Sequence, residues 1–196
     1  IKKVSGKLPD DLGVLLAYAK AQIANRDMAG AKSILTNATR VAEYNPAPQL
    51  QVAILQLAAN NVPGAAYSLE KALSTQPDFL PAQALMAEVE LRQGDAAKAE
   101  KRARDIVAKH PKRAIGHSLL GDIAVARNQP GLAQASYRTA HQLEPSTETL
   151  LRLFGAMGNL ESGKPALQLA EQWMKTHPTD ARTQRALADG YARTGN

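Results

Sequence analysis

Three columns of residues, repeated about every 34 positions, predict an all-α repeat protein built from antiparallel helix pairs. The first column places a small residue at the head of an apolar helical run, at Ala31, Ala65, Ala99, Ala133 and Ala166. The second lies seven residues further on, at Ala38, Ala72, Ile106, Ala140 and Trp173. The third lies twelve residues beyond the first, at Glu43, Pro77, Pro111, Pro145 and Pro178. Small side chains let two helices approach closely, so the columns indicate stacked helical units.

Local signals divide each unit into two helices. Breakers stand between the helices at 25–27, 60–61, 94–95, 128–130 and 162–163. Three of these positions offer a good N-cap to the second helix, at Asp27, Asn61 and Asp95. Prolines expected in the first turn of the second helix, where a missing N–H is harmless, are Pro63, Pro130 and Pro165. The third column ends that helix, because proline cannot continue it.

With these columns the chain resembles the tetratricopeptide repeat over essentially its whole length. That family alternates a helix A and a helix B, with small residues near positions 8, 20 and 27 and proline at 32. The resemblance implies a right-handed superhelical solenoid of about five repeats plus one terminal helix. The frame gives repeats at 12–45, 46–79, 80–113, 114–147 and 148–180, and a partial repeat at 181–196 in a single solenoid, 12–196. Residues 1–11 are expected to be the tail of a preceding helix or a linker, so the chain is expected to be cut from a longer array.

In this frame Gly121 and Gly155 match the small position 8 of their repeats. The chain departs from the family pattern twice. Glu43 stands where the first repeat would have proline, and the fifth repeat is one residue short, expected near 158–163.

Composition narrows the function classes. The chain has no cysteine, so disulfides and thiolate sites are excluded. No apolar run approaches the roughly 20 residues of a membrane span. The net charge of +6 suggests an anionic partner, but only 4% of residues are aromatic, which argues against nucleic acid as the ligand. Many basic residues lie within 98–113, either on a solvated helix face or in a patch for an anionic partner.

Residue spacing favours a non-enzymatic protein without metal or cofactor. The four histidines, at 110, 117, 141 and 177, form no pair at helical metal-site spacing. Neither a phosphate-binding loop nor a dinucleotide fingerprint occurs, and no spacing suggests a nucleophile with its base. Trp173 is expected to pack between helices, with stacking on a ligand as the alternative.

The family resemblance also implies where a partner binds, because helix A residues line the concave groove of tetratricopeptide proteins. The matching positions are Leu16, Lys20, Leu50, Ile54, Leu57, Glu88, Leu91, Asp122, Val125, Arg152, Arg185 and Asp189. We expect a protein or peptide there, on a groove that changes from apolar to mixed and basic along the chain. The alternative is that Leu50, Ile54 and Leu57 belong partly to the core. The Lys/Asn/Arg clamp of chaperone-tail binders is not reproduced.

A narrower resemblance rests on two strings, at 116–122 and 173–180, together with Leu187 and Tyr191. They look like the tetratricopeptide lipoproteins of the exosortase/PEP-CTERM system. That implies a periplasmic or outer-membrane-anchored protein of a Gram-negative envelope, linked to exopolysaccharide production and protein sorting. The periplasmic part of a polysaccharide exporter, a basic solenoid that binds an anionic polymer, and a cytoplasmic location stay open. The oligomeric state is left open too.

Overall fold

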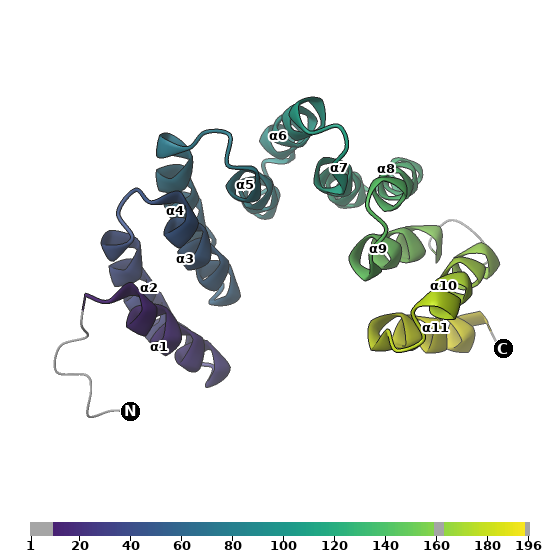
Figure 1. Ribbon diagram of the computed structural model, residues 1–196, viewed down its shortest axis with the longest axis horizontal. Helices are drawn as coiled ribbons and strands as arrows, with labels where there is room; N and C mark the ends of the chain where they lie inside the picture. Colours follow the sequence, from purple (N-terminus) through teal and green to yellow (C-terminus); the bar gives the residue numbers. More distant parts are fainter. Residues whose placement is uncertain (1–9, 159–162, 195–196) are drawn as a thin grey trace. The chain divides into compact units, whose positions relative to one another are not determined.

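A computed structural model describes residues 10–158 and 163–194, and within them forms eleven α-helices and no strand (Figure 1). In chain order the helices are α1 (Leu12–Ala24), α2 (Met28–Val41), α3 (Pro46–Ala58), α4 (Val62–Thr75), α5 (Leu80–Arg92), α6 (Ala96–Lys109), α7 (Ala114–Ala126), α8 (Pro130–Leu143), α9 (Thr147–Gly158), α10 (Lys164–Thr176) and α11 (Ala181–Thr194). The predicted all-α class is confirmed. Residues 1–9, including most of the expected N-terminal tail, lie outside the described residues.

The helices keep the period of the sequence columns. Helices α2, α4, α6 and α8 begin at 28, 62, 96 and 130, each 34 residues after the last. Ala31, Ala65, Ala99 and Ala133 therefore occupy the fourth residue of these B helices, and none is more than 1% exposed. The buried column explains why the positions hold alanine, since a larger side chain would hold the helices apart.

The turns between helices A and B follow from local backbone chemistry. Asp27 caps α2 by accepting a hydrogen bond of 2.8 Å from Gly30 N, and Asn61 caps α4 by accepting one from Gly64 N. One residue in each of the first four turns has positive φ, and these are Arg26, Asn60, Gly94 and Asn128. Glycine and asparagine adopt this left-handed conformation readily, which is why they recur in the turns. The N-caps predicted at Asp27 and Asn61 are confirmed, and the one predicted at Asp95 stays a prediction.

The missing proline of the first repeat has a conformational reason. Glu43 lies in the connection between α2 and α3 with φ of +50°. Proline fixes φ near −65° and cannot adopt that conformation. The connection spans four residues, as do those around Pro77 and Pro111, so the first repeat keeps its length but turns differently.

The short fifth repeat loses its residue at a different place from the one expected. Helix α9 begins 33 residues after α7, and the connection before α9 has three residues, 144–146, where the others have four. The shift therefore follows Pro145 and precedes α9, rather than lying near 158–163, of which 159–162 are outside the described residues. The small position 8 moves with it: Phe154, not Gly155, takes the place of Gly121, and Gly155 is exposed with open space around it. The alignment of Gly155 with Gly121 was wrong.

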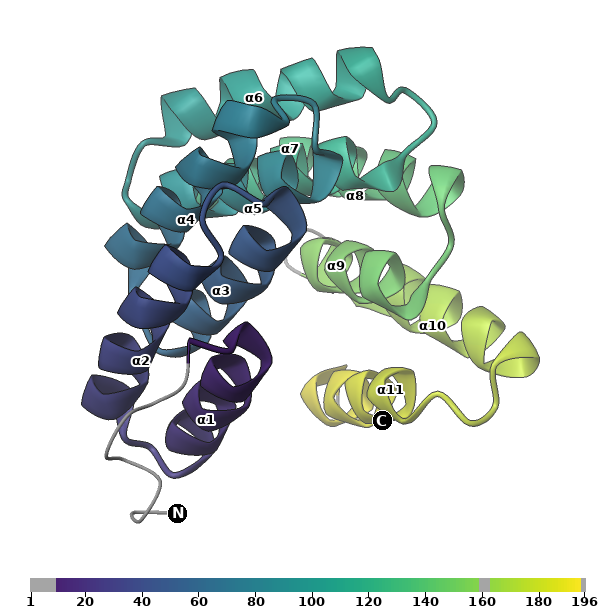
Figure 2. The same ribbon diagram turned by 60° about the vertical axis from the view of Figure 1, so that its left-hand side comes forward.

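The helices form two compact units, up to Asp95 and from Ala96. In the first unit α1 packs on α2, α3 on α4, and α4 on α5, and the A helices α1, α3 and α5 also contact one another in series. In the second unit α7 packs on α8, α8 on α9, and α10 on α9 and α11, with further contacts from α7 to α9 and from α9 to α11. Figure 2 shows the paired helices side by side in a second view. The cores are built mainly from alanine and leucine.

Candidate functional site: the exposed side of the A helices

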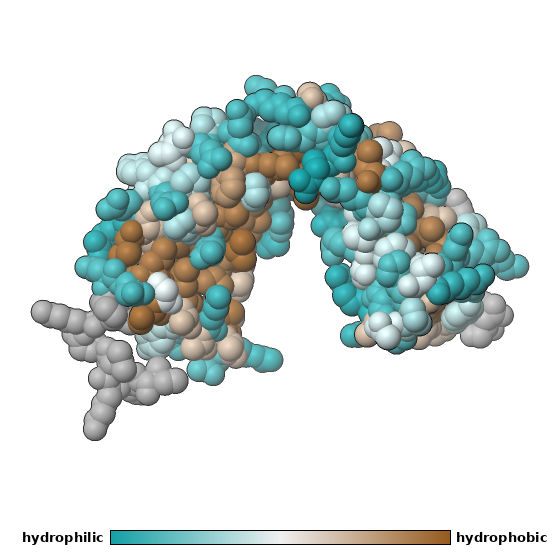
Figure 3. Space-filling view, in the orientation of Figure 1, coloured by the Kyte–Doolittle hydropathy of each residue, from teal (hydrophilic) through white to brown (hydrophobic). Residues whose placement is uncertain are grey.

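In the first unit, the candidate surface centres on α3. Leu50, Ile54 and Leu57 follow the spacing i, i+4, i+7 and so lie on one side of that helix. Ile54 is 50% exposed, whereas Leu50 and Leu57 are half-buried and pack against the core of α3, α4 and α5. Hydrophobic residues gather on the visible face of this unit in Figure 3. The two interpretations of Leu50, Ile54 and Leu57, as a partner-binding surface and as part of the core, thus each hold in part. Ile54 offers exposed apolar surface, whereas Leu50 and Leu57 also pack in the core.

The flanking helices contribute less apolar surface. Leu16 on α1 is only 9% exposed and belongs to the core of α1, α2 and α3, so little of it remains for a partner. Lys20 on the same helix is exposed. On α5, Leu91 is half-buried, and Glu88 forms an i, i+4 ion pair with Arg92 at 2.6 Å. The surface of α3 is therefore apolar between helices that carry charges.

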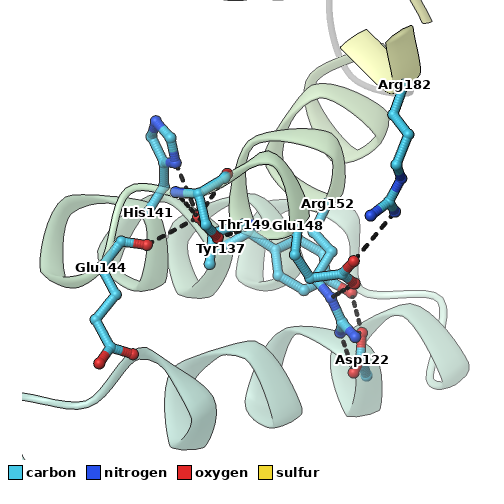
Figure 4. Close-up of polar contacts among 9 residues, drawn as sticks. Asp122, Tyr137, His141, Glu144, Glu148, Thr149, Arg152 and Arg182 are labelled. Atoms are coloured by element: carbon cyan, nitrogen blue, oxygen red, sulfur yellow. Dashed lines mark hydrogen bonds and ion pairs between the residues drawn. The ribbon is translucent and has the colours of Figure 1, made fainter. Parts of the chain in front are cut away.

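The corresponding surface of the second unit is polar and internally paired. Arg152 on α9 binds both carboxylate oxygens of Asp122 on α7, and its Nε donates to Glu148 at 3.0 Å. Arg182 on α11 donates to Glu148 at 3.1 Å, which extends the chain of ion pairs across three A helices (Figure 4). The hydroxyl of Tyr137, from α8, donates to Asp122 at 2.7 Å.

These contacts shift the pKa values of Glu148 and Tyr137. The hydrogen bond from Arg152 lowers the pKa of Glu148, and the bond from Arg182 adds to it. Burial and then the bond to Asp122 raise the pKa of Tyr137. Glu148 therefore stays ionised and Tyr137 stays neutral near neutral pH, and the ion pairs balance the charges of this surface within the protein.

The other candidates in this unit are exposed. Val125 on α7 has 57% of its surface free, and Arg185 and Asp189 on α11 are both exposed. The sequence reasoning missed Glu148, although a signal for it existed. Glu148 and Arg182 carry opposite charges one 34-residue period apart, as expected for a contact between equivalent positions of neighbouring repeats.

Trp173 has partners within the protein. Its ring stacks on that of His177 with centroids 3.8 Å apart and lies 5.7 Å from that of His141. Its Nε1 donates to Asp180 at 2.9 Å. These contacts favour the predicted packing role over stacking on a ligand.

The basic stretch is partly neutralised by its own carboxylate. Glu100 on α6 pairs with both Arg104 and Arg127, and the hydrogen bond from Arg127 is the main reason that the pKa of Glu100 is lowered. Lys101 is exposed on the same helix. Among residues 10–158 and 163–194, no group of three His, Cys, Asp or Glu side chains could hold a metal ion. Nor is any helix in that part of the chain long and apolar enough to cross a membrane.

Comparisons with known proteins give the same fold. Residues 56–123 match the model of a tetratricopeptide repeat family. A thermophilic tetratricopeptide protein of Thermus thermophilus, TTC0263, is 19% identical, with a TM-score of 0.71 over 92% of this chain and 99% of its own. The type IV pilus biogenesis factor PilW is 16% identical, with a TM-score of 0.64 over 91% of this chain and 84% of its own. A chain of the APC/C hetero-tetramer Cut9–Hcn1 is 15% identical, with a TM-score of 0.65 over 98% of this chain and 38% of its own. No curated protein sequence matches.

Proposed function

We propose that this chain, a tetratricopeptide repeat protein, is a non-enzymatic scaffold that holds a protein segment against the A helices of residues 10–95. The observation that supports the proposal is the exposed apolar row of α3, with Ile54 50% exposed between two half-buried leucines. Tetratricopeptide proteins bind protein partners in general, so this surface is the first place to look for one.

Affinity at this surface would come chiefly from apolar burial. Removing apolar area from water contributes about 25 cal/mol per Å², from which the cost of ordering the partner must be subtracted. The second unit offers a different surface, because Asp122, Arg152, Glu148 and Arg182 already neutralise one another. A partner that bound there would have to replace existing ion pairs, so the first unit is the favoured site.

The narrower setting that we propose is the bacterial cell envelope, in the periplasm or anchored to the outer membrane, in exopolysaccharide production and protein sorting. The support is the resemblance of the strings at 116–122 and 173–180 to tetratricopeptide lipoproteins of the exosortase/PEP-CTERM system.

A second candidate function is binding of an anionic polymer along α6. The net charge of +6 and the exposed Lys101 favour it. The ion pairs of Glu100 with Arg104 and Arg127 count against it, because this carboxylate offsets part of the positive charge at α6.

Site-specific photo-crosslinking in the cells that make the protein tests the proposal. A photoreactive residue replaces Ile54 in one variant and the exposed Thr36 of α2 in a matched control. We expect a discrete protein adduct from position 54 and none from position 36. Adducts with nucleic acid or polysaccharide, or equal protein labelling from both positions, would contradict the scaffold proposal.

A further inference from the structure

Four polar side chains meet in the interior of the first unit, between α2, α3 and α4. Gln49 and Ser68 are fully buried, Gln56 is 2% exposed and Thr39 is 5% exposed. The surrounding cores consist mainly of alanine, leucine and valine. Buried polar groups need hydrogen-bond partners, so each donor and acceptor in this cluster can be followed in turn.

The orientation of the Gln49 amide is fixed by two carbonyls. Its Nε2 donates to Thr39 O at 2.8 Å and to Glu43 O. Backbone carbonyls only accept hydrogen bonds, so the atom that faces both of them has to be the amide nitrogen. The Oε1 of Gln49 therefore points elsewhere, and exchanging the two amide atoms would not give it a partner.

The orientation of the Gln56 amide is fixed by Thr39. The hydroxyl of Thr39 donates its proton to Leu35 O at 2.9 Å, so toward other groups it can only accept. It accepts from Gln56 Nε2 at 3.1 Å and from the hydroxyl of Ser68 at 3.1 Å. The hydroxyls of Thr39 and Ser68 thus both use their protons in these bonds, and neither can donate to Gln56 Oε1.

Two amide oxygens remain without a donor. Gln49 Oε1 and Gln56 Oε1 are both buried, and no donor among the described residues reaches either of them. The ammonium of Lys71 is occupied nearby, 3.4 Å from Thr39 O and over the rings of Tyr44 and Tyr67 at 4.8 and 5.6 Å.

We infer that Gln49 Oε1 and Gln56 Oε1 each bind an ordered water molecule, so that the interior between α2, α3 and α4 is a hydrated polar site. The ligand has to be a hydrogen-bond donor because both free atoms are acceptors. It has to be small because the site lies inside a packed helical core. Water meets both requirements, and buried waters characteristically satisfy such groups.

The hydrated site also fixes the orientation of α3. Gln49 and Gln56 are seven residues apart and so lie on one side of the helix, where both donate to Thr39 of α2. The inference rests on this hydrogen-bond accounting and does not depend on the proposed partner surface.

Nuclear magnetic resonance of the whole chain tests the inference. We expect the side-chain amide protons of Gln49 and Gln56 to show Overhauser contacts with water of the sign given by a bound molecule. Gln184, an exposed glutamine whose amide donates to Pro178 O at 2.7 Å, is the matched control and should show only the sign given by bulk water. If the amide protons of both buried glutamines show Overhauser contacts of the bulk-water sign, or no contact with water, the inference is overturned.

Crystal structures of the wild type and of Gln56→Met give an independent result. Water density should lie beside both amide oxygens in the wild type. In Gln56→Met it should vanish beside residue 56 and persist beside Gln49, since methionine has no amide oxygen. In Gln49→Met the water density should vanish beside residue 49 and persist beside Gln56. Water density that persists beside a substituted residue would contradict the assignment.

Discussion

Gly121 of α7 lies directly against the ring of Tyr137 of α8, so a Cβ added at Gly121 would come within 3.0 Å of three ring carbons. The absence of a side chain at this position is what lets the two helices of the fourth repeat approach each other. Gly155 of α9, by contrast, has open space where its Cβ would be. Two glycines that look equivalent in the sequence thus have different reasons to be there.

Substituting these two glycines should change stability in opposite directions. Gly121→Ala forces Tyr137 to move and should cost roughly 1–3 kcal/mol, the usual range for overpacking. Gly155→Ala should stabilise by up to about 1 kcal/mol, because alanine is the better helix former. Denaturant unfolding monitored by circular dichroism measures both free energies. Equal destabilisation by the two substitutions would mean that Gly155 is packed against a neighbouring helix as Gly121 is, and would contradict the shifted register of α9.

The alanine column should be equally intolerant of larger side chains. Ala133 is 1% exposed in the contact of α8 with its neighbours, so Ala133→Leu should cost roughly 1–3 kcal/mol. Ala135 is exposed on the same helix and provides the control, since Ala135→Leu should leave the unfolding free energy nearly unchanged. A melting temperature that Ala133→Leu does not lower would show that the small column is not steric.

Tyr137 should contribute through both its ring and its hydroxyl. Tyr137→Phe removes the bond to the charged Asp122 and should cost about 1.5–3 kcal/mol. Tyr137→Ala also removes a ring that is 5% exposed, and should cost about 3–5 kcal/mol. Chemical denaturation compares the two variants, and a Phe variant as destabilised as the Ala variant would mean that the hydroxyl, not the packing, dominates.

Asp180 should make the second unit sensitive to acid. Its carboxylate accepts hydrogen bonds from Thr147 on α9, from Trp173 on α10 and from Thr183 on α11. The bond from Thr147 is the largest cause of a pKa well below the ordinary value, and burial opposes it. A depressed folded-state pKa gives stability that is present above the unfolded pKa of about 3.9 and is lost as pH falls toward the folded value.

Thermal melts of the wild type and of Asp180→Asn across acidic pH measure this contribution. Asparagine keeps an N-cap for α11 but removes the charge. We expect the wild type to melt at the higher temperature near neutral pH, and the difference to shrink steadily below about pH 4. A difference that is independent of pH would mean that the charge of Asp180 does not stabilise the fold.

Much of the fold could be predicted from the sequence because the period and the local signals agree. Ala65 and Asn61 both indicate the start of α4, Ala65 because it packs in the core and Asn61 because it caps the helix. The place of the missing residue could not be found this way. The sequence allows either Phe154 or Gly155 at position 8, and the start of α9 together with the burial of Phe154 decides between them.

The candidate site was less predictable than the fold. Side-chain exposure depends on how neighbouring helices rotate, so Leu16 and Ile54, which the family pattern treats alike, differ between a buried and a half-exposed state. The ion pair of Arg152 with Asp122 spans 30 residues and depends on the register of α9, which the sequence did not reveal. Whether the twelve helix A residues bind a partner stays a prediction.

The most direct test of the scaffold proposal is a calorimetric titration with the protein captured from position 54, at low and at high salt. Ile54→Ser is a better variant than Leu57→Ser, because Ile54 is 50% exposed while Leu57 also packs in the core. It should weaken binding about tenfold, as expected for losing about 1.4 kcal/mol of apolar burial, and leave the salt dependence unchanged. Lys101→Ala with Arg102→Ala should change the affinity little. If the Lys101/Arg102 variant loses binding with a shallower salt dependence while Ile54→Ser binds normally, the partner is held by charge on α6 and the account is contradicted.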